Sequence, residues 1–288
     1  MCSIPVVIFH INGRQDYFVN CVNLSSTKNK VYLIGDDSNK DAFVNNQNVT
    51  FFHIDDLHSK KAEEFKHAFV NYSTNVGTYE LLCFLRVFYL NKLLKKTGDQ
   101  WVFHTDSDCI VLDNITKLFP ENKRCVSYSI QKVDNPHHMV GSIHNALLNS
   151  KFCDKFIELC LDIYKTRTKF HLIEPKIQWH NQVGMGGGIC DMTLYYLLWS
   201  EKIIDVTDLN ELIEYGDNDG ESAMFDHNIN DPYGFKGEDT YHLVNGIKRV
   251  VMKDGNYYFA DKDGMLRRTL TLHFQGRAKS ILSGFSFE

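Results

Sequence analysis

The sequence predicts an α/β protein with a mixed, mainly parallel sheet flanked by helices and a β-rich C-terminal extension. Apolar runs alternate with helical patterns through the first third of the chain, which is the order of parallel strands joined by right-handed crossover helices. From Gly246 onward, short β-forming runs separated by turn residues replace the helical patterns. These two patterns predict an open sheet first and a smaller β-rich region after it.

Composition limits the class of protein. With 43% hydrophobic residues and a net charge of -5, the 288 residues can form one domain with an ample core. The mild acidity argues against a general nucleic-acid binder, which needs a clustered basic surface. No apolar run reaches the roughly 18 residues of a membrane span, and the N-terminus enters a strand without a charged leader. The eight cysteines include no C-x-x-C pair, so we expect reduced thiols and a cytoplasmic protein.

The first third should alternate strand and helix, with strands at Ile4–Phe9, Lys30–Gly35 and Val49–Ile54 and helices at Arg14–Leu24 and Asp56–Val70. Residues that follow parallel strands lie at one edge of the sheet. The loop with His10 and Asn12, and the pair that ends in Asp37, should therefore lie close together. They could receive a nucleotide, with a carboxylate accepting from the base or the ribose; ordinary strand-to-helix turns are the alternative.

The pattern from Thr78 to Lys96 is a helix with apolar side chains on nearly every face, so it should be largely buried. Arg86 lies in the middle of that apolar surface. Because a guanidinium keeps its charge, it needs an anion. The anion is either a carboxylate such as Glu80, Asp106 or Asp108, or a phosphate or sugar of a ligand. Both hold if Arg86 braces a metal site.

The stretch WVFHTDSDCIVL, residues 101–112, places two carboxylates where a core strand ends. Asp106 and Asp108, on either side of Ser107, repel each other unless a cation lies between them. A divalent cation that prefers oxygen, Mg²⁺ or Mn²⁺ carrying phosphate, is the simplest answer. A solvated Asp-Ser-Asp turn is the alternative.

The middle of the chain should contain a strand at Arg124–Ile130 and an amphipathic helix at Lys151–Tyr164. A glycine run that includes Gly187 and Gly188 follows, and it permits close approach to a ligand or a positive φ. Asp191 then precedes a leucine-rich helix. It is either the N-cap of that helix or a carboxylate that contacts a sugar or activates a hydroxyl.

The last third begins with a long polar segment, Glu211–Tyr241, whose length is typical of a lid or mobile loop. A hairpin should follow, with Ile247–Met252 and Tyr257–Ala260 on either side of a turn at 254–256. The final strand, Arg267–His273, leads into His273-x-x-Gly276-x-x-Lys279. A histidine at a strand end can complete a metal site begun by two aspartates. An ordinary strand end with a solvated basic tail is the alternative.

Asp106-Ser107-Asp108 together with His273-x-x-Gly276-x-x-Lys279 resembles the metal-dependent glycosyltransferases of the GT-A fold. The pattern is most similar to the family that holds glycogenin and the lipopolysaccharide galactosyltransferases. The resemblance follows the order of elements over most of the chain. It implies one Rossmann-like domain, with a nucleotide-binding half at 1–112 and an acceptor half at 113–288 that carries the metal-binding strand.

The resemblance also implies residue roles. Mn²⁺, or Mg²⁺, would be bound by Asp106, Asp108 and His273. The donor would be contacted by Arg86, Gly276 and Lys279. Position alone, after parallel strands, between the two aspartates or in the glycine run, makes a second set candidate donor contacts, namely His10, Asn12, Asp37, Ser107, Gly187 and Gly188. Asp191 would be the catalytic residue near the donor sugar and the acceptor.

The expected activity is transfer of a sugar from a UDP-sugar to a hydroxyl of a glycan, a lipid-linked sugar or a protein. The resemblance implies retention of configuration, whereas an inverting enzyme would use Asp191 as a general base. No nucleic-acid partner is expected, and peripheral contact with a membrane stays open.

Three other readings compete. A sugar-nucleotide nucleotidyltransferase normally has an N-terminal glycine-rich, basic phosphate loop, which His10–Gln15 matches poorly. A phosphatase would have Thr or Val two residues after the second aspartate, where this chain has Ile110. A sugar-binding module without transfer activity would be favoured by loss of a metal ligand, yet all three candidate ligands are present.

Overall fold

The computed structural model describes residues 3–214, 222–231 and 240–283, and a seven-stranded sheet forms its centre. The strand order is β3-β2-β1-β4-β7-β6-β8. The first four of these strands are parallel, whereas β7 is antiparallel to both neighbours. The prediction of a mixed, mainly parallel sheet is confirmed. The strands are β1 (Val6–Phe9), β2 (Val31–Gly35), β3 (Val49–His53), β4 (Trp101–Thr105), β6 (Ser127–Gln131), β7 (Val140–Asn149) and β8 (Thr207–Asp208).

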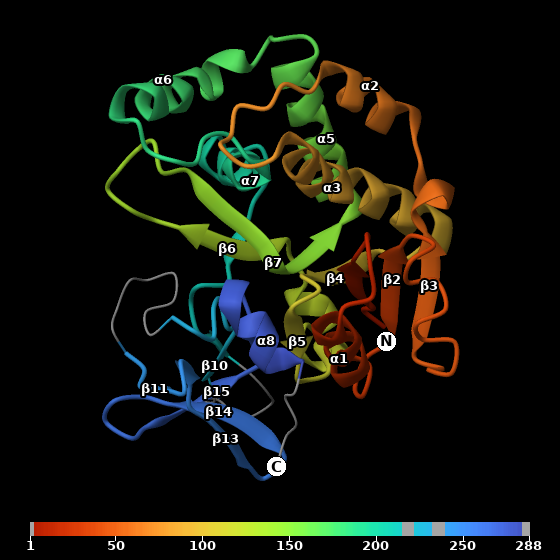
Figure 1. Ribbon diagram of the computed structural model, residues 1–288, viewed down its shortest axis with the longest axis vertical. Helices are drawn as coiled ribbons and strands as arrows, with labels where there is room; N and C mark the ends of the chain where they lie inside the picture. Colours follow the sequence, from red (N-terminus) through yellow and green to blue (C-terminus); the bar gives the residue numbers. More distant parts are fainter. Residues whose placement is uncertain (1–2, 215–221, 232–239, 284–288) are drawn as a thin grey trace.

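Helices cover both faces of this sheet (Figure 1). Alternate residues of β1 enter different cores, because Val7 packs with the helices of one face while Val6 and Ile8 pack toward the other. The first face carries α2 (Lys60–Ala68), α3 (Gly77–Thr97), α5 (Ser150–Tyr164), α6 (Glu174–Val183) and α7 (Asp191–Ser200). The second face carries α1 (Asp16–Ser25), α4 (Ile115–Leu118) and α8 (Lys279–Leu282).

The β-rich extension forms a second sheet in the order β13-β14-β15-β10-β9. Its hairpin lies where the sequence predicts one, and its turn has Asp254 at φ 52 and Gly255 at φ 74. Positive φ at both central residues suits the twist of the two strands. The strands of the extension are β9 (Ile213–Glu214), β10 (Ser222–Met224), β13 (Val250–Lys253), β14 (Asn256–Ala260) and β15 (Leu266–Thr269), with a separate pair β11 (Leu243–Val244) and β12 (Ile247–Lys248).

The predicted final strand is split at Leu270 into β15 and β16 (Thr271–His273). β16 pairs antiparallel with β5 (Cys109–Val111), so that His273 lies opposite Cys109. One chain segment therefore joins the C-terminal sheet to the loop that follows β4. The two motifs are 165 residues apart from Asp108 to His273 by their numbers, and this pairing brings them together.

Three parts of the fold differ from the sequence-based expectation. β7 is the longest strand and α6 is a regular helix, and neither is evident from the hydrophobic pattern. β7 escapes detection because Ser142, His144 and Asn145 interrupt its apolar run although all three are buried. The prediction of a loop over Glu211–Tyr241 is wrong for its described part, which contains β10 and a buried Phe225. Residues 215–221 and 232–239 lie outside the described residues.

A buried ion pair connects this segment to the rest of the extension. Lys248 Nζ lies 2.7 Å from Asp226 Oδ1, and both side chains are fully buried. Lys248 also donates to the carbonyl of Asn228, and Asp226 Oδ2 accepts from the backbone N–H of His273. Because every group of the pair has a partner, the charges tolerate burial, and loss of one would leave the other uncompensated.

We predict that Lys248→Ala lowers the free energy of unfolding by about 3–5 kcal/mol, because it leaves the Asp226 carboxylate buried without a cation. Urea unfolding measures the loss. Lys253→Ala, which removes an exposed lysine from the neighbouring strand, is the matched control and should change stability by less than about 0.5 kcal/mol. Equal stability of the two variants would contradict this account of the buried pair.

Candidate active site

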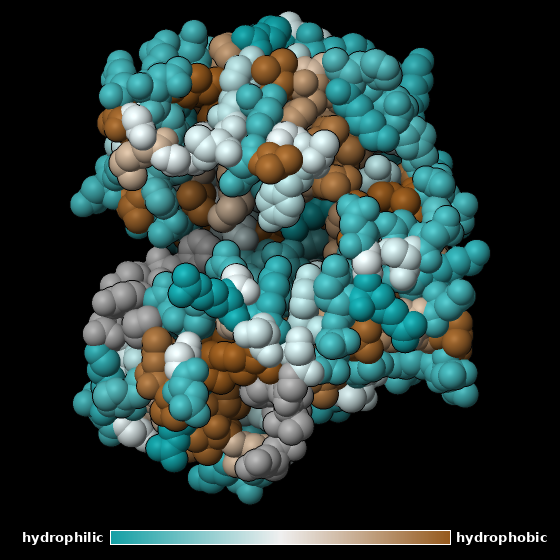
Figure 2. Space-filling model, viewed as in Figure 1, coloured by the Kyte–Doolittle hydropathy of each residue, from teal (hydrophilic) through white to brown (hydrophobic). Residues whose placement is uncertain are grey.

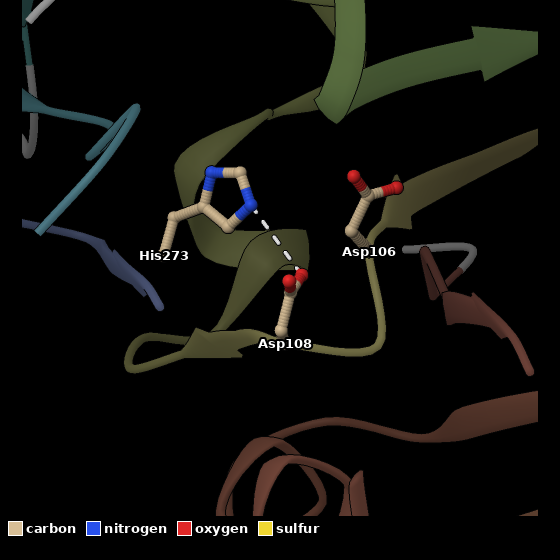
Figure 3. A group of neighbouring side chains, drawn as sticks. All are labelled: Asp106, Asp108 and His273. Atoms are coloured by element: carbon tan, nitrogen blue, oxygen red, sulfur yellow. Dashed lines mark ion pairs between the residues drawn. The ribbon is translucent and has the colours of Figure 1, made fainter. Parts of the chain in front are cut away.

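The site begins at the turn after β4, where three candidate metal ligands converge. Asp106, Asp108 and His273 each offer a ligand atom, and these atoms lie within 4.8 Å of one another. Figure 3 shows the two carboxylates on the loop between β4 and β5 and the imidazole facing them from β16. Two carboxylate oxygens and one imidazole nitrogen suit Mn²⁺ or Mg²⁺. The donor set therefore fits the cation that the sequence suggests.

His273 is held with one ring nitrogen toward the carboxylates. Its Nδ1 lies 2.6 Å from the carbonyl of His227, and its Nε2 lies 3.4 Å from Asp108 Oδ1. Because the carbonyl can only accept, Nδ1 carries a proton and Nε2 faces the site. The ring also stacks on His144, with centroids 4.8 Å apart. These contacts fix the orientation that a metal ligand needs.

The charges of the site depend on one another. Burial raises the pKa of Asp106, but Arg86 and the nearby imidazoles outweigh burial and hold that pKa well below its ordinary value. Burial lowers the pKa of His273, yet Asp108 and Asp106 raise it to about 9. His273 is then protonated near neutral pH beside the carboxylates. A metal ion that binds here must displace that proton.

Lys279 lies beside one of these carboxylates, that of Asp108. Its Nζ is 3.1 Å from Asp108 Oδ2 and 5.1 Å from the centroid of the Tyr17 ring. Burial lowers the pKa of Lys279, but Asp108 raises it above its ordinary value. The ammonium is therefore a permanent positive charge at the entrance to the metal ligands. Gly276, at φ 57, lines the same pocket.

Arg86 braces two carboxylates from different elements. Its Nη1 donates to Asp106 at 2.8 Å and its Nη2 donates to Asp191 at 2.6 Å. Asp191 is the first residue of α7, whose N-cap is Cys190, so the reading of Asp191 as an N-cap is wrong. Its side chain is 5% exposed. The carboxylate instead completes an Asp106-Arg86-Asp191 chain that ties α3 and α7 to the loop after β4.

Two pockets meet at this chain. The larger, about 520 Å³, is lined by candidate donor-binding residues and by aromatic and apolar side chains, including His10, Asn12, Tyr17, Tyr79, Arg86, Ser107, Gly276 and Lys279. The smaller, about 200 Å³, is lined by Glu80, Asp191, His144 and His227 among others. Arg86, Asp106 and His273 line both. Two of the candidate metal ligands, Asp106 and His273, thus lie where the two pockets join, and Asp108 lines the larger one. Figure 2 shows a polar hollow between the upper and lower parts of the molecule.

The N-terminal candidates do not all reach this region. His10 is buried against Phe18 and hydrogen bonds to Ser107, so it supports the turn as well as lining the larger pocket. Asn12 lines the pocket, and its backbone N–H donates to Asp36. Asp37, by contrast, is 89% exposed, lies 3.5 Å from His53 and lines neither pocket. Of the aspartate pair, Asp36 is the one that faces the loop after β1.

The glycine run is a packing feature in this structure. Gly188 has φ 127, and a Cβ on it would lie 2.1 Å from the carbonyl oxygen of Tyr72. Gly187 has φ 112, its N–H donates to Thr74, and a Cβ would lie 2.9 Å from His180. Neither glycine lines either pocket. The run lets the chain before α7 pair with residues 72–74, and this pairing fixes the start of α7, where Asp191 lies.

Several residues of the site are not evident from the sequence. His144 lies on the unexpected strand β7, and His227 lies in the segment expected to be a loop. Tyr79 and Glu80 belong to the predicted helix α3. No motif marks Tyr79, and the sequence suggests Glu80 only as an ion-pair partner of Arg86, which pairs instead with Asp106 and Asp191. For Glu80, the available signal in the sequence was its position as the carboxylate in the first turn of a helix that has apolar side chains on nearly every face. Only the packing shows which pocket each of these side chains lines.

Among the described residues, no helix is both long and apolar enough to cross a membrane. The chain matches no family model and no curated protein sequence.

Several solved structures are similar at low identity. Mouse xyloside xylosyltransferase 1 is 14% identical, with coverage of 72% of this chain and 85% of that chain and a TM-score of 0.45. The PaToxG glycosyltransferase is 12% identical over 69% of each chain, with a TM-score of 0.41. A glycosyltransferase involved in the glycosylation of the major capsid of PBCV-1 is 11% identical over 98% of each chain, with a TM-score of 0.42. Similarity this distant carries no argument, so the case for an activity rests on the residues of the site.

We predict that Gly188→Ala lowers the free energy of unfolding by about 2–4 kcal/mol, because the new methyl group meets the Tyr72 backbone and φ is unfavourable for alanine. Gly186→Ala is the matched control, since its Cβ would have only an ordinary contact of 3.6 Å with Thr74. Thermal unfolding of both variants measures the difference. If Gly188→Ala were as stable as Gly186→Ala, the packing role of the run would be wrong.

Proposed function

We propose that this protein is a metal-dependent glycosyltransferase that moves a hexose from a UDP-sugar to an acceptor hydroxyl. The observation that carries the proposal is the cluster of Asp106, Asp108 and His273 in a nucleotide-sized pocket, with Asp106 and His273 also lining a smaller one. A donor with its diphosphate at these ligands would place its nucleoside on one side and its sugar on the other. The acceptor would be a glycan, a lipid-linked sugar or a protein.

The larger pocket supports binding of the nucleoside diphosphate. Its volume of about 520 Å³ lies in the usual range for small-molecule sites. Tyr17 and Tyr79 offer aromatic surface for a base or ribose, and Asn12 offers polar atoms near them. Lys279 and Gly276 also line this pocket, and the ammonium of Lys279 lies 3.1 Å from Asp108 Oδ2. This is the arrangement expected for a bound diphosphate.

Several residues would together stabilise the negative charge that develops on the departing UDP. A Mn²⁺ ion held by the two aspartates and His273 would supply Lewis-acid stabilisation of charge on the diphosphate. Lys279 adds a fixed positive charge to the same oxygens, and Gly276 allows backbone close to them. Since these groups act on charge that grows as the sugar bond breaks, they favour the transition state over the bound donor.

Asp191 is proposed to act on the sugar side. Its Oδ2 accepts from Arg86 and its Oδ1 accepts from the backbone N–H of Met192, so both oxygens are held in place. A fixed carboxylate can orient the sugar and stabilise positive charge at its anomeric carbon. This restraint is what supports retention of configuration over a mechanism with Asp191 as a mobile general base.

The cellular setting is part of the proposal. All seven described cysteines are free, and four of them are buried. Burial raises the pKa of the Cys21 and Cys153 thiols, which makes them inert packing groups. Free thiols of this kind suit a reducing, cytoplasmic compartment.

The first experiment is hydrolysis of a panel of UDP-sugars, followed as UDP release with Mn²⁺ and with a chelator. We expect one donor to be cleaved in the presence of Mn²⁺, with the rate lost on chelation because the diphosphate charge is no longer offset. Calorimetry of UDP with Mn²⁺ on the same sample is the companion measurement. The proposed function would be refuted if no donor were cleaved and UDP did not bind in the presence of Mn²⁺.

Asp108→Asn should reduce UDP-sugar cleavage more than about 100-fold while the protein stays folded, because the amide is a poor ligand for the cation. Asp37→Asn is the matched control, since Asp37 lies on the surface outside both pockets. It should retain the wild-type rate. Full activity of Asp108→Asn would remove the metal assignment.

A further inference from the structure

The smaller pocket contains a buried carboxylate that the proposed reaction does not use. Glu80 is 1% exposed and lines this pocket near the N-terminal end of α3. Its Oε1 accepts from Asn75 Nδ2 at 2.6 Å and from Ser73 Oγ at 3.1 Å. Its Oε2 is buried and has no hydrogen-bond partner among the described residues. A buried acceptor without a partner is costly unless a ligand satisfies it.

The position of Glu80 is fixed by several independent contacts. Ser73, one of its donors, pairs through its backbone with Gly188 of the glycine run. Asn75 lines the same pocket. The carboxylate also lies near the positive end of the α3 dipole, which favours a negative charge there. Two donors, Ser73 and Asn75, thus hold the Glu80 side chain in one orientation, as recognition of a ligand requires.

The charges around the pocket define what it can accept. Three carboxylates line it, Glu80, Asp106 and Asp191, against the guanidinium of Arg86 and the imidazole of His273, which faces Asp108. Arg86 already donates to Asp106 and Asp191. Burial raises the pKa of Glu80, and the charge of Asp191 adds to this effect, which the hydrogen bonds from Asn75 and Ser73 only partly offset. Such a pocket disfavours an anion and suits a neutral molecule with hydroxyl donors.

Size narrows the choice further. A volume of about 200 Å³ is below the usual range for drug-sized ligands, so the pocket admits a single small ring rather than a nucleoside. It shares Arg86, Asp106 and His273 with the larger pocket. A ligand whose diphosphate lies at the metal ligands would therefore project its sugar toward Glu80.

We propose that Glu80 is a donor-specificity residue, whose unpaired oxygen accepts a hydrogen bond from a hydroxyl of the transferred sugar, and that the donor sugar is a neutral hexose. This inference rests on the proposed function. It assigns the smaller pocket to the donor and excludes donors with a carboxylate on the ring, such as a uronic acid, because that charge would face Glu80 and Asp191.

The test compares wild type with Glu80→Gln in UDP-sugar hydrolysis without an acceptor. The panel contains UDP-glucose, UDP-galactose, UDP-N-acetylglucosamine and UDP-glucuronic acid, together with deoxy analogues of the preferred donor. Glu80→Gln keeps the shape of the side chain and the bonds to Ser73 and Asn75 but replaces the free acceptor by a donor. We expect kcat/KM for the preferred donor to fall about ten- to hundredfold. Glu158→Gln, on the exposed face of α5, is the control.

Three results would support the assignment together. One deoxy analogue is cleaved slowly by wild type, and Glu80→Gln cleaves that analogue and its parent at similar rates. UDP affinity with Mn²⁺ is the same in both proteins, since UDP occupies the larger pocket. UDP-glucuronic acid is a poor donor for wild type.

Other results would overturn it. Unchanged donor preference in Glu80→Gln would remove Glu80 from donor recognition. An equal loss of rate for every donor and analogue would make it a catalytic group instead, and preference of wild type for UDP-glucuronic acid would refute the charge argument. These failures differ from failure of the proposed function, in which wild type neither cleaves a UDP-sugar nor binds UDP with Mn²⁺.

Discussion

The pairing of β16 with β5 is the contact on which the rest of the site depends. It places His273 opposite Cys109, one residue after Asp108, and so converts two distant motifs into one cluster. The buried Asp226–Lys248 pair also fixes β16, because Asp226 accepts a hydrogen bond from the backbone N–H of His273. An ion pair in the core of the extension is therefore coupled to the orientation of a candidate metal ligand.

Electrostatics determines how the site can work. Carboxylates gather from the loop after β4 and from α7, and Arg86, Lys279 and a protonated His273 balance them. Lys279 and His273 both face Asp108, so a divalent cation would compete with them for the same oxygens. Arg86 instead pairs with Asp106 and Asp191. The region thus has a replaceable charge beside Asp108 and a fixed charge between Asp106 and Asp191.

Much of the framework could be predicted from the sequence because its signals are local. Apolar runs mark the parallel strands, and the expected helix at Thr78–Lys96 is α3 within one residue at each end. The strand β7 could not be found in this way, since its buried Asn145 is satisfied by a distant partner, the carbonyl of Asp226. A polar residue with a tertiary partner has the same appearance in the sequence as one in a loop.

The sequence by itself determined the carboxylate chemistry of the candidate metal site, because Asp106 and Asp108, two positions apart, share one turn. Tertiary structure alone decided which neighbours face that chemistry. Of two adjacent aspartates, Asp37 points to the surface while Asp36 faces the loop after β1, and the glycine run packs on residues 72–74 rather than on a pocket. The sequence shows Glu80 only as a helix residue near Arg86. Packing alone buries its Oε2 and leaves that oxygen without a hydrogen-bond partner among the described residues. Side-chain direction and burial depend on contacts between distant segments, which no local pattern records.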